Sequence, residues 1–205
     1  LNQVSYEEML EMAQHGAKVM HPRAVELGEV YRMPIVVRSS FNDNPGTLIR
    51  EGEGMENRKK VRGVTCDTNI AKITVHDVPD RPGLASAIFV PLADAHVNVD
   101  TIVQNVGHAG STDVSFTVSR TDLDMARDVI QATIPKIGAR GMTATDDLAK
   151  VSIVGTGIQS HPGYAARMFT ALAGADVNIG MISTSEIRIT CLIDRAAANE
   201  AVRAL

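Results

Sequence analysis

Residues 61–75 read VRGVTCDTNIAKITV, and residues 139–153 read ARGMTATDDLAKVSI. The match resumes with RPGLASAIFVPLADAHVNVD at residues 81–100 and HPGYAARMFTALAGADVNIG at residues 161–180, after an insertion of two residues in the second copy. Gly, Pro, Ala, Leu and Asn positions fall in register between the copies. Self-similarity of this length indicates that one structural unit occurs twice in the chain.

Each repeat predicts elements in the order β-α-β-β-α. β-branched runs bounded by Gly, Pro and Asp predict first strands at 70–76 and 150–154, and apolar residues at helical spacing follow Pro82-Gly83 and Pro162-Gly163. Two further strands and a second helix are predicted at 97–103, 113–119 and 122–134, and at 177–182, 187–193 and 195–205. This order predicts an α+β protein of two ferredoxin-like βαββαβ units.

The closing strands of the two repeats differ in their place along the chain. Residues 140–145 close repeat one, whereas repeat two ends on its second helix at Leu205. Residues 61–66 have the same character as 140–145 but precede repeat one. Because an unpaired sheet edge promotes aggregation, we predict that residues 61–66 close repeat two. The first unit (68–146) is then inserted into the second (61–67 plus 147–205).

The first fifty residues do not belong to the repeats. Ser5-Tyr6-Glu7-Glu8 predicts a helix start with a capping box, and Pro22 predicts a second helix. Short strands are predicted at 34–38 and 47–49. Residues 1–50 are therefore expected to be an α/β fragment too short to be a whole domain. The charged, glycine-containing residues 51–60 are predicted to be a linker.

Composition excludes several classes of protein. The net charge is −4 and aromatic residues make up 3%, which argues against binding to nucleic acid. No apolar run approaches the ~18 residues of a membrane span and no secretory signal is recognised, so we expect a cytoplasmic protein. Cys66 and Cys191 fit no metal spacing; both are expected to be buried small hydrophobes, and no metal site is predicted.

Several segments resemble one family. GAKVMHPRAVE (16–26) followed by MPIVVRSSFNDNPGTLI (33–49) resembles the last segment of the aspartate kinase catalytic domain. AKITVHDVPDRPGLAS (71–86) and AKVSIVGTGIQSHPG (149–163) resemble the two ACT units of that family. The segment ISTSEIRI (182–189), with the preceding SHPG and VNI, is similar to the β subunit of α2β2 aspartate kinases.

The resemblance implies a function. This chain would be the regulatory region of an enzyme that phosphorylates L-aspartate with ATP, the first step of aspartate-family amino-acid biosynthesis. Threonine, lysine or both would act as feedback inhibitors. The family's catalytic motifs lie in an N-terminal domain not present here, so we expect no catalytic residues, no activity of the chain alone, and ATP and Mg only in that domain. Expected partners are a second copy bound through the ACT units, or a catalytic α subunit.

A free amino acid offers a carboxylate and an ammonium, and a helix N-terminus offers unpaired N–H groups to the carboxylate. Asp80 is a candidate partner for the ammonium, and Gln104 could fix other polar groups. In the family the second ACT unit lends an Asn-Ile pair, which matches Asn178 and Ile179; by pseudo-symmetry Asn98 would act at another interface. The candidate effector residues are Asp80, Pro82, Gly83, Leu84, Ala85, Asn98, Gln104, Asn178 and Ile179.

A second candidate effector site would use repeat two: His161, Pro162, Gly163, Ser183, Thr184, Ser185 and Glu186. Structural alternatives stay open at this point. Asp80 could cap the helix, the Pro-Gly pairs could be simple turns, and Gln104 could be an exposed strand end. Asn98 and Asn178 could cap turns, and residues 183–186 could form a polar bend between strands.

Three other functions compete with amino-acid sensing in a kinase. An ACT sensor of another pathway is disfavoured by residues 4–49, which resemble the kinase. An RNA-binding split βαβ domain would need exposed aromatics on its central strands, where only Phe116 occurs. A stand-alone enzyme using Cys191 or His161 lacks a recognisable nucleophile–base pair.

Overall fold

The computed structural model describes residues 1–52, 61–105, 110–158 and 162–205. It separates the chain into two compact units, one of residues 1–68 with 149–205 and the other of residues 69–148. The predicted linker falls mostly on residues 53–60, outside the described residues. Two long strands, β4 (Gly63–Pro79) and β7 (Gly141–Val154), contribute one part of their length to each unit.

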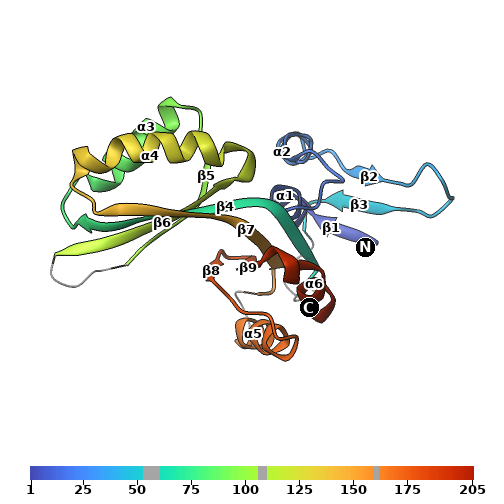
Figure 1. The fold of residues 1–205 in the computed structure, drawn as a ribbon. Coiled ribbons are helices and arrows are strands. Elements are labelled where there is room, and N and C mark those ends of the chain that lie inside the picture. Colours follow the sequence, from blue (N-terminus) through green and yellow to red (C-terminus); the bar gives the residue numbers. More distant parts are fainter. Residues whose placement is uncertain (53–60, 106–109, 159–161) are drawn as a thin grey trace. The chain divides into compact units, whose positions relative to one another are not determined.

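The unit of residues 69–148 contains repeat one. After β4 come α3 (Leu84–Asp94), β5 (Val99–Gln104), β6 (Ser111–Ser119), the short 3₁₀ helix Arg120–Asp122, α4 (Leu123–Ile137) and β7. The strand order is β5-β6-β4-β7, and α3 and α4 lie on the same side of this sheet (Figure 1). This is the ferredoxin-like order, and the predicted fold class is confirmed.

The core of repeat one lies between this sheet and its two helices. Alternate residues of β4 point to the helices, as the two-residue period of a strand requires. Ala71, Ile73 and Val75 are all fully buried, together with Ile88 of α3 and Ile130 of α4. Burial of each large aliphatic side chain contributes roughly 1.5–3 kcal/mol, so this layer holds the helices on the sheet.

The unit of residues 1–68 and 149–205 contains repeat two. After β7 come α5 (Tyr164–Gly174), β8 (Met181–Thr184), β9 (Arg188–Asp194), the 3₁₀ helix Arg195–Ala197 and α6 (Ala198–Ala204). The strand order is β4-β7-β9-β8. The backbone N–H of Arg62 donates to the carbonyl of Val154 at 2.7 Å, and Val61, Val64 and Cys66 pack against the core of this repeat. The chain before repeat one thus lies in the sheet of repeat two.

The strands are longer than the sequence predicts. Residues 61–66 and 70–76 were expected as separate strands, and so were 140–145 and 150–154, but each pair forms one continuous strand. No Gly or Pro interrupts residues 67–69 or 145–149, and the two strands are hydrogen-bonded neighbours. An extended chain with a paired neighbour has no reason to break at polar residues alone.

The N-terminal segment forms its own small sheet. Its elements are β1 (Gln3–Ser5), α1 (Tyr6–Gln14), α2 (Pro22–Val30), β2 (Ile35–Val37) and β3 (Thr47–Arg50), with strand order β1-β3-β2. The predicted capping box is confirmed: the Glu8 N–H donates to Ser5 Oγ at 3.1 Å, and the Ser5 N–H donates to Glu8 Oε2 at 3.2 Å. Strand β1 was not predicted, because three residues carry too little pattern.

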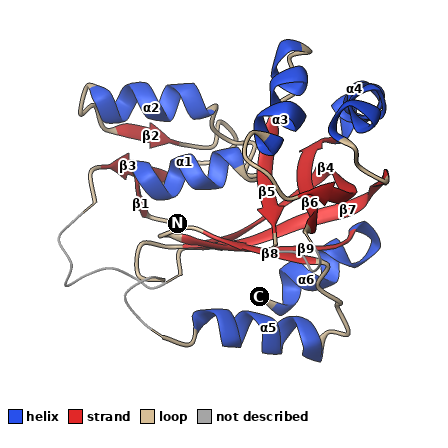
Figure 2. Cartoon of the chain, turned by 90° about the vertical axis from the view of Figure 1, so that its left-hand side faces the viewer, coloured by secondary structure: helices blue, strands red, loops and turns tan. Residues whose placement is uncertain are grey.

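Helices cover both faces of the sheet of repeat two. Helices α5 and α6 pack on one face, and α1 lies on the other (Figure 2). Cys191 is fully buried among the residues packed under α5 and α6, and burial raises the pKa of its thiol to about 11. Cys66 was predicted to be buried as well, but it is only half-buried. None of the described helices has the length and apolar character needed to cross a membrane.

Candidate effector-binding site

The turn before α3 carries five of the predicted effector residues, which are Asp80, Pro82, Gly83, Leu84 and Ala85. Gly83 adopts φ +88°, a left-handed conformation that glycine takes without strain. Among the described residues, apart from Gly83 itself and its chain neighbours, no atom lies within 4 Å of the position where a Cβ would stand on Gly83. Pro82 and Ala85 beside it are exposed, whereas the Leu84 side chain is buried. The glycine therefore serves the turn conformation and leaves open space in front of the helix.

Not every backbone N–H in this turn is available to a ligand. The Leu84 N–H already donates to the Arg81 carbonyl at 3.3 Å, and the Asp80 N–H donates to the Gly110 carbonyl at 2.9 Å. The Asp80 side chain is exposed, and Gly83 at the helix N-cap makes no side-chain cap. The prediction that Leu84 supplies a free N–H is weakened by its hydrogen bond in the turn.

Asp80 and Gln104 lie at the same end of repeat one. Strand β5 runs back from the C-terminal end of α3, so Gln104 at its end returns toward the Pro82-Gly83 turn. Gln104 pairs with Val114 in β6, and Pro79 in β4 pairs with Ser111. The topology therefore gathers Asp80, the turn and Gln104 at one end of the strands of this sheet.

Asn98 lies at the other end of α3. This helix has 11 residues, which at ~1.5 Å per residue is roughly 16 Å. Asn98 lines a pocket of about 530 Å³ with Phe89, Ala93, His96, Val97, Val99 and Ile102. Asn98 therefore lies too far from the Asp80 turn of the same unit to contact a ligand held there, and its role at another interface stays a prediction.

The second Pro-Gly turn repeats the geometry of the first. Gly163 has φ +102°, and no described residue beyond its chain neighbours comes within 4 Å of a Cβ placed on it. The Arg167 N–H donates to its carbonyl at 3.0 Å. Pro162 is exposed, whereas His161 lies outside the described residues. Asn178 is exposed and Ile179 half-buried, in the segment between α5 and β8. The two turns are thus equivalent in backbone conformation.

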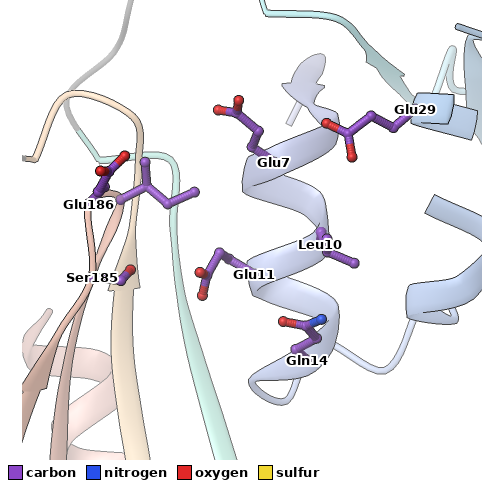
Figure 3. A pocket seen from close by; sticks show the side chains of 8 residues that line it. Glu7, Leu10, Glu11, Gln14, Glu29, Ser185 and Glu186 are labelled. Carbon is purple, nitrogen blue, oxygen red and sulfur yellow. The ribbon is translucent and has the colours of Figure 1, made fainter. Parts of the chain in front are cut away.

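Residues 183–186 form the predicted polar bend. Ser183 and Thr184 end β8, and the Ser185 N–H donates to the Arg188 carbonyl at 2.9 Å. Ser185 and Glu186 line a pocket of about 340 Å³ together with Glu7, Glu11 and Glu29. In Figure 3, the side chains of Glu7 and Glu11 project from α1 toward the bend that carries Ser185 and Glu186. These two residues therefore face the N-terminal segment.

A polar cluster that the sequence did not predict lies on the sheet of repeat one. His76 Nδ1 is 3.0 Å from Asp113 Oδ2, and His76 Nε2 is 2.9 Å from Thr143 Oγ1. The Asp77 N–H donates to Asp113 Oδ1 at 2.9 Å. This backbone donor, followed by His76, lowers the pKa of Asp113 from its ordinary value of 3.8. The cluster is satisfied internally and half-exposed.

Comparison with known proteins identifies the family. The ACT domain family matches residues 71–133 and again residues 151–205. The regulatory subunit of aspartate kinase from Thermus thermophilus, in its ligand-free form, is 38% identical with a TM-score of 0.67, and the match covers 71% of this chain and 96% of that one. The chain belongs to the aspartate kinase family. It is the ACT-type regulatory region of such a kinase.

Other relatives of this aspartate kinase chain agree. A structure of aspartokinase alpha and beta subunits is 44% identical, with a TM-score of 0.66 over 70% of this chain and 95% of that one. The aspartate kinase of Pseudomonas fluorescens is 47% identical over 100% of this chain and 50% of its own length. The chain thus spans half the length of the curated aspartate kinases that it matches.

The aspartate kinase chain also holds a buried contact that sequence reasoning missed. Glu8 of α1 is 1% exposed. Its Oε1 accepts hydrogen bonds from the N–H and hydroxyl of Thr156, at 3.1 and 3.0 Å, and Arg62 Nε lies 3.3 Å from its Oε2. One turn further along α1, Glu11 Oε2 lies 3.5 Å from Arg188 Nη1 and 3.2 Å from His15 Nε2. Only the capping box drew attention to Glu8 in the sequence.

Among the described residues, no group of three or more His, Cys, Asp or Glu side chains could hold a metal ion.

Proposed function

We propose that this regulatory region binds threonine, lysine or both at the Asp80–Ala85 turn, as a feedback inhibitor of aspartate phosphorylation. The proposal rests on one observation: Asp80, Gln104 and the Pro82-Gly83 turn lie at the same end of the strands of repeat one. A carboxylate there complements an ammonium. The helix N-terminus complements a carboxylate. Asn178 and Ile179 would complete the site from another ACT unit.

Regulation follows if the ligand binds one arrangement of paired ACT units better than another. A ligand shifts a conformational equilibrium only by its difference in affinity between the states. A ligand touched by polar groups of two units binds fully only when those units are paired. The paired arrangement would then hold the attached kinase domain in an inactive state. An ACT sensor of another pathway is the alternative, and binding of a different amino acid would favour it.

Calorimetry of the chain with threonine, with lysine and with both together tests the proposal. We expect binding of at least one, and about tenfold weaker binding after Asp80→Ala, because one charge-assisted hydrogen bond is lost. Asp94→Ala is the matched control, since Asp94 is an exposed carboxylate at the other end of the same helix. Unchanged affinity in Asp80→Ala would remove Asp80 from the site. No binding of either amino acid at millimolar concentration would reject the function.

We further propose that the chain alone does not phosphorylate aspartate, and that ATP and Mg act only in a catalytic domain. The chain covers half of its kinase relatives, and the residues it contains match the regulatory subunit over most of that subunit's length. Its partner would be a second copy through the ACT units or a catalytic α subunit, in the cytoplasm. An assay with ATP, Mg and aspartate should show turnover only when a catalytic half is supplied. Turnover by the chain alone would overturn this.

A further inference from the structure

Glu8 brings three segments of the chain to one buried carboxylate. Thr156 reaches it from the end of β7, Arg62 from the start of β4, and Ser5 from the N-cap of α1. The N–H and hydroxyl of Thr156 donate to Oε1, and the Ser5 N–H donates to Oε2. Arg62 Nε donates to Oε1 at 3.4 Å and also lies 3.3 Å from Oε2. A buried carboxylate is tolerated only with such a full set of partners. If any one of these segments moved away, a buried polar group would lose its hydrogen-bond partner.

Thr156 belongs to the short loop that leads from β7 toward the Pro162-Gly163 turn. This loop, residues 155–158, is buried throughout. The Gly155 N–H donates to the Ile187 carbonyl at 2.8 Å, and the Ile158 N–H donates to the Gly155 carbonyl at 3.1 Å. One side of the loop is therefore tied to the β8–β9 bend, and the other side is tied to α1 through Glu8.

The close packing of α1 against repeat two extends beyond this carboxylate. Gly16, just after α1, has φ +112°, and a Cβ there would stand 2.2 Å from the Cys66 carbonyl oxygen. Val154, next to the loop, packs in one cluster with Val4, Met9 and Met12. Apolar contacts therefore hold α1 close to repeat two, and the Glu8 carboxylate fixes its position relative to residues 155–158.

Repeat one lacks the chemistry for the same link. The two-residue insertion of repeat two falls between positions 75/153 and 81/161, so the counterpart of Thr156 is Val78 at the first offset and His76 at the second. His76 is bonded to Asp113 and Thr143 of its own repeat. Valine offers no hydroxyl, and Val78 is fully buried in the core of its own repeat. The link to the N-terminal segment is therefore specific to repeat two.

We propose that Glu8 couples α1 to residues 155–158, the loop that precedes the second Pro-Gly turn in the sequence. A conformational change at that turn would then alter the stability of α1. The coupling itself is a property of this chain. It rests on the proposed function only in that an amino acid would be what changes the turn. Glu8 is a positioning residue in this role and need not touch the amino acid.

Amide hydrogen exchange on the full chain tests the coupling without any ligand. Thr156→Val removes one donor and keeps the side-chain shape, and Glu8→Gln removes the charge. Each variant should speed exchange about tenfold in both α1 and residues 155–158, since a local opening then needs one bond fewer. The double variant should exchange faster by less than the product of the two single effects, because both substitutions weaken the same link. Glu7→Gln, an exposed neighbour on α1, should change neither element.

The outcome is decisive even if Glu8→Gln fails to fold. Faster exchange in the loop of Thr156→Val, with α1 unchanged, would overturn the coupling. Added threonine or lysine gives a separate result. If the amino acid binds and α1 exchange changes in the parent chain but not in Thr156→Val, the coupling carries the signal. If it binds and α1 never responds, the inference fails while the function stands. If neither amino acid binds, the function fails, and the ligand-free exchange decides the coupling.

Discussion

The two ACT repeats each have a core built from equivalent residues, and they differ in what covers the other face of their sheets. Ala71, Ile73 and Val75 point to the helices in repeat one, as do Ala149, Val151 and Ile153 in repeat two. Even the polar pairs are repeated: Thr74 Oγ1 lies 2.8 Å from Ser115 Oγ, and Ser152 Oγ lies 2.7 Å from Thr190 Oγ1. The core is therefore conserved between the copies almost position by position.

The sheet faces that point away from the helices differ at the position that follows Val75 in β4 and Ile153 in β7. Repeat one has His76 there, half-exposed and bonded to Asp113 and Thr143. Repeat two has Val154, fully buried in the cluster that it shares with α1. Opposite them stand Asp113 and Arg188, and Arg188 pairs with Glu11 of α1. Repeat two therefore carries the N-terminal segment on this face, whereas repeat one carries a polar, half-exposed cluster there.

The largest expected effect comes from one core position at which the equivalent residues differ strongly in volume. Phe116 packs edge-on against Phe89 with ring centroids 5.3 Å apart, whereas Cys191 takes the matching place in repeat two; both are fully buried. Phe116→Ala should cost about 4 kcal/mol of unfolding free energy and Cys191→Ala about 1 kcal/mol, because the cavity scales with the atoms removed. Urea unfolding measures both. Equal losses would mean that the cores are not packed as differently as the side chains suggest.

Exchanging the divergent residues comes next. Val154→His places an imidazole in a dry cluster with no partner and should cost about 3 kcal/mol. The reciprocal His76→Val should change stability by less than about 1 kcal/mol, since His76 lies in a half-exposed polar cluster. Both are compared with the parent chain by urea unfolding at pH 7. A costly His76→Val together with a harmless Val154→His would reverse the comparison.

The two glycine turns should respond alike. Gly83→Ala and Gly163→Ala should each destabilise the protein by about 1–2 kcal/mol, because a left-handed φ is costly for any side chain. The residues that the structure describes offer no atom for a Cβ to clash with at either position, so the backbone conformation alone sets the expected loss. Thermal unfolding of the two variants checks this. A loss at one turn several times that at the other would show that the turns are not equivalent.

The smallest effect is a pH dependence confined to repeat one. The pKa of Asp113 is lowered in the folded state, so its ionised form stabilises the fold above its ordinary pKa of 3.8, and that contribution is lost as the pH falls through the lower, folded value. Asp113→Asn should be slightly less stable than the parent near pH 6, and the gap should close below about pH 4. Because Asp113 is largely exposed, the gap is small. A gap that widens in acid would contradict the assignment.

Sequence alone determined the parts of this protein that depend on neighbours in the chain. The order of strands and helices, both glycine turns and the Ser5–Glu8 capping box depend on residues a few positions apart. The repeat is visible when two stretches of the same sequence are compared. The strand at residues 61–66 was placed beside repeat two from the need to pair a sheet edge. The grouping of Asp80 and Gln104 follows the same topology.

Tertiary structure decided what those elements do together. The sequence marked Glu8 only as the third helical residue of its capping box, three positions from Ser5. Its bond to Thr156 joins residues 148 positions apart. No local propensity or periodicity reports such a pair, because any of the chain's carboxylates could satisfy a hydroxyl and an amide. Only the packing of α1 against repeat two removes water from Glu8, and that burial makes its partners obligatory.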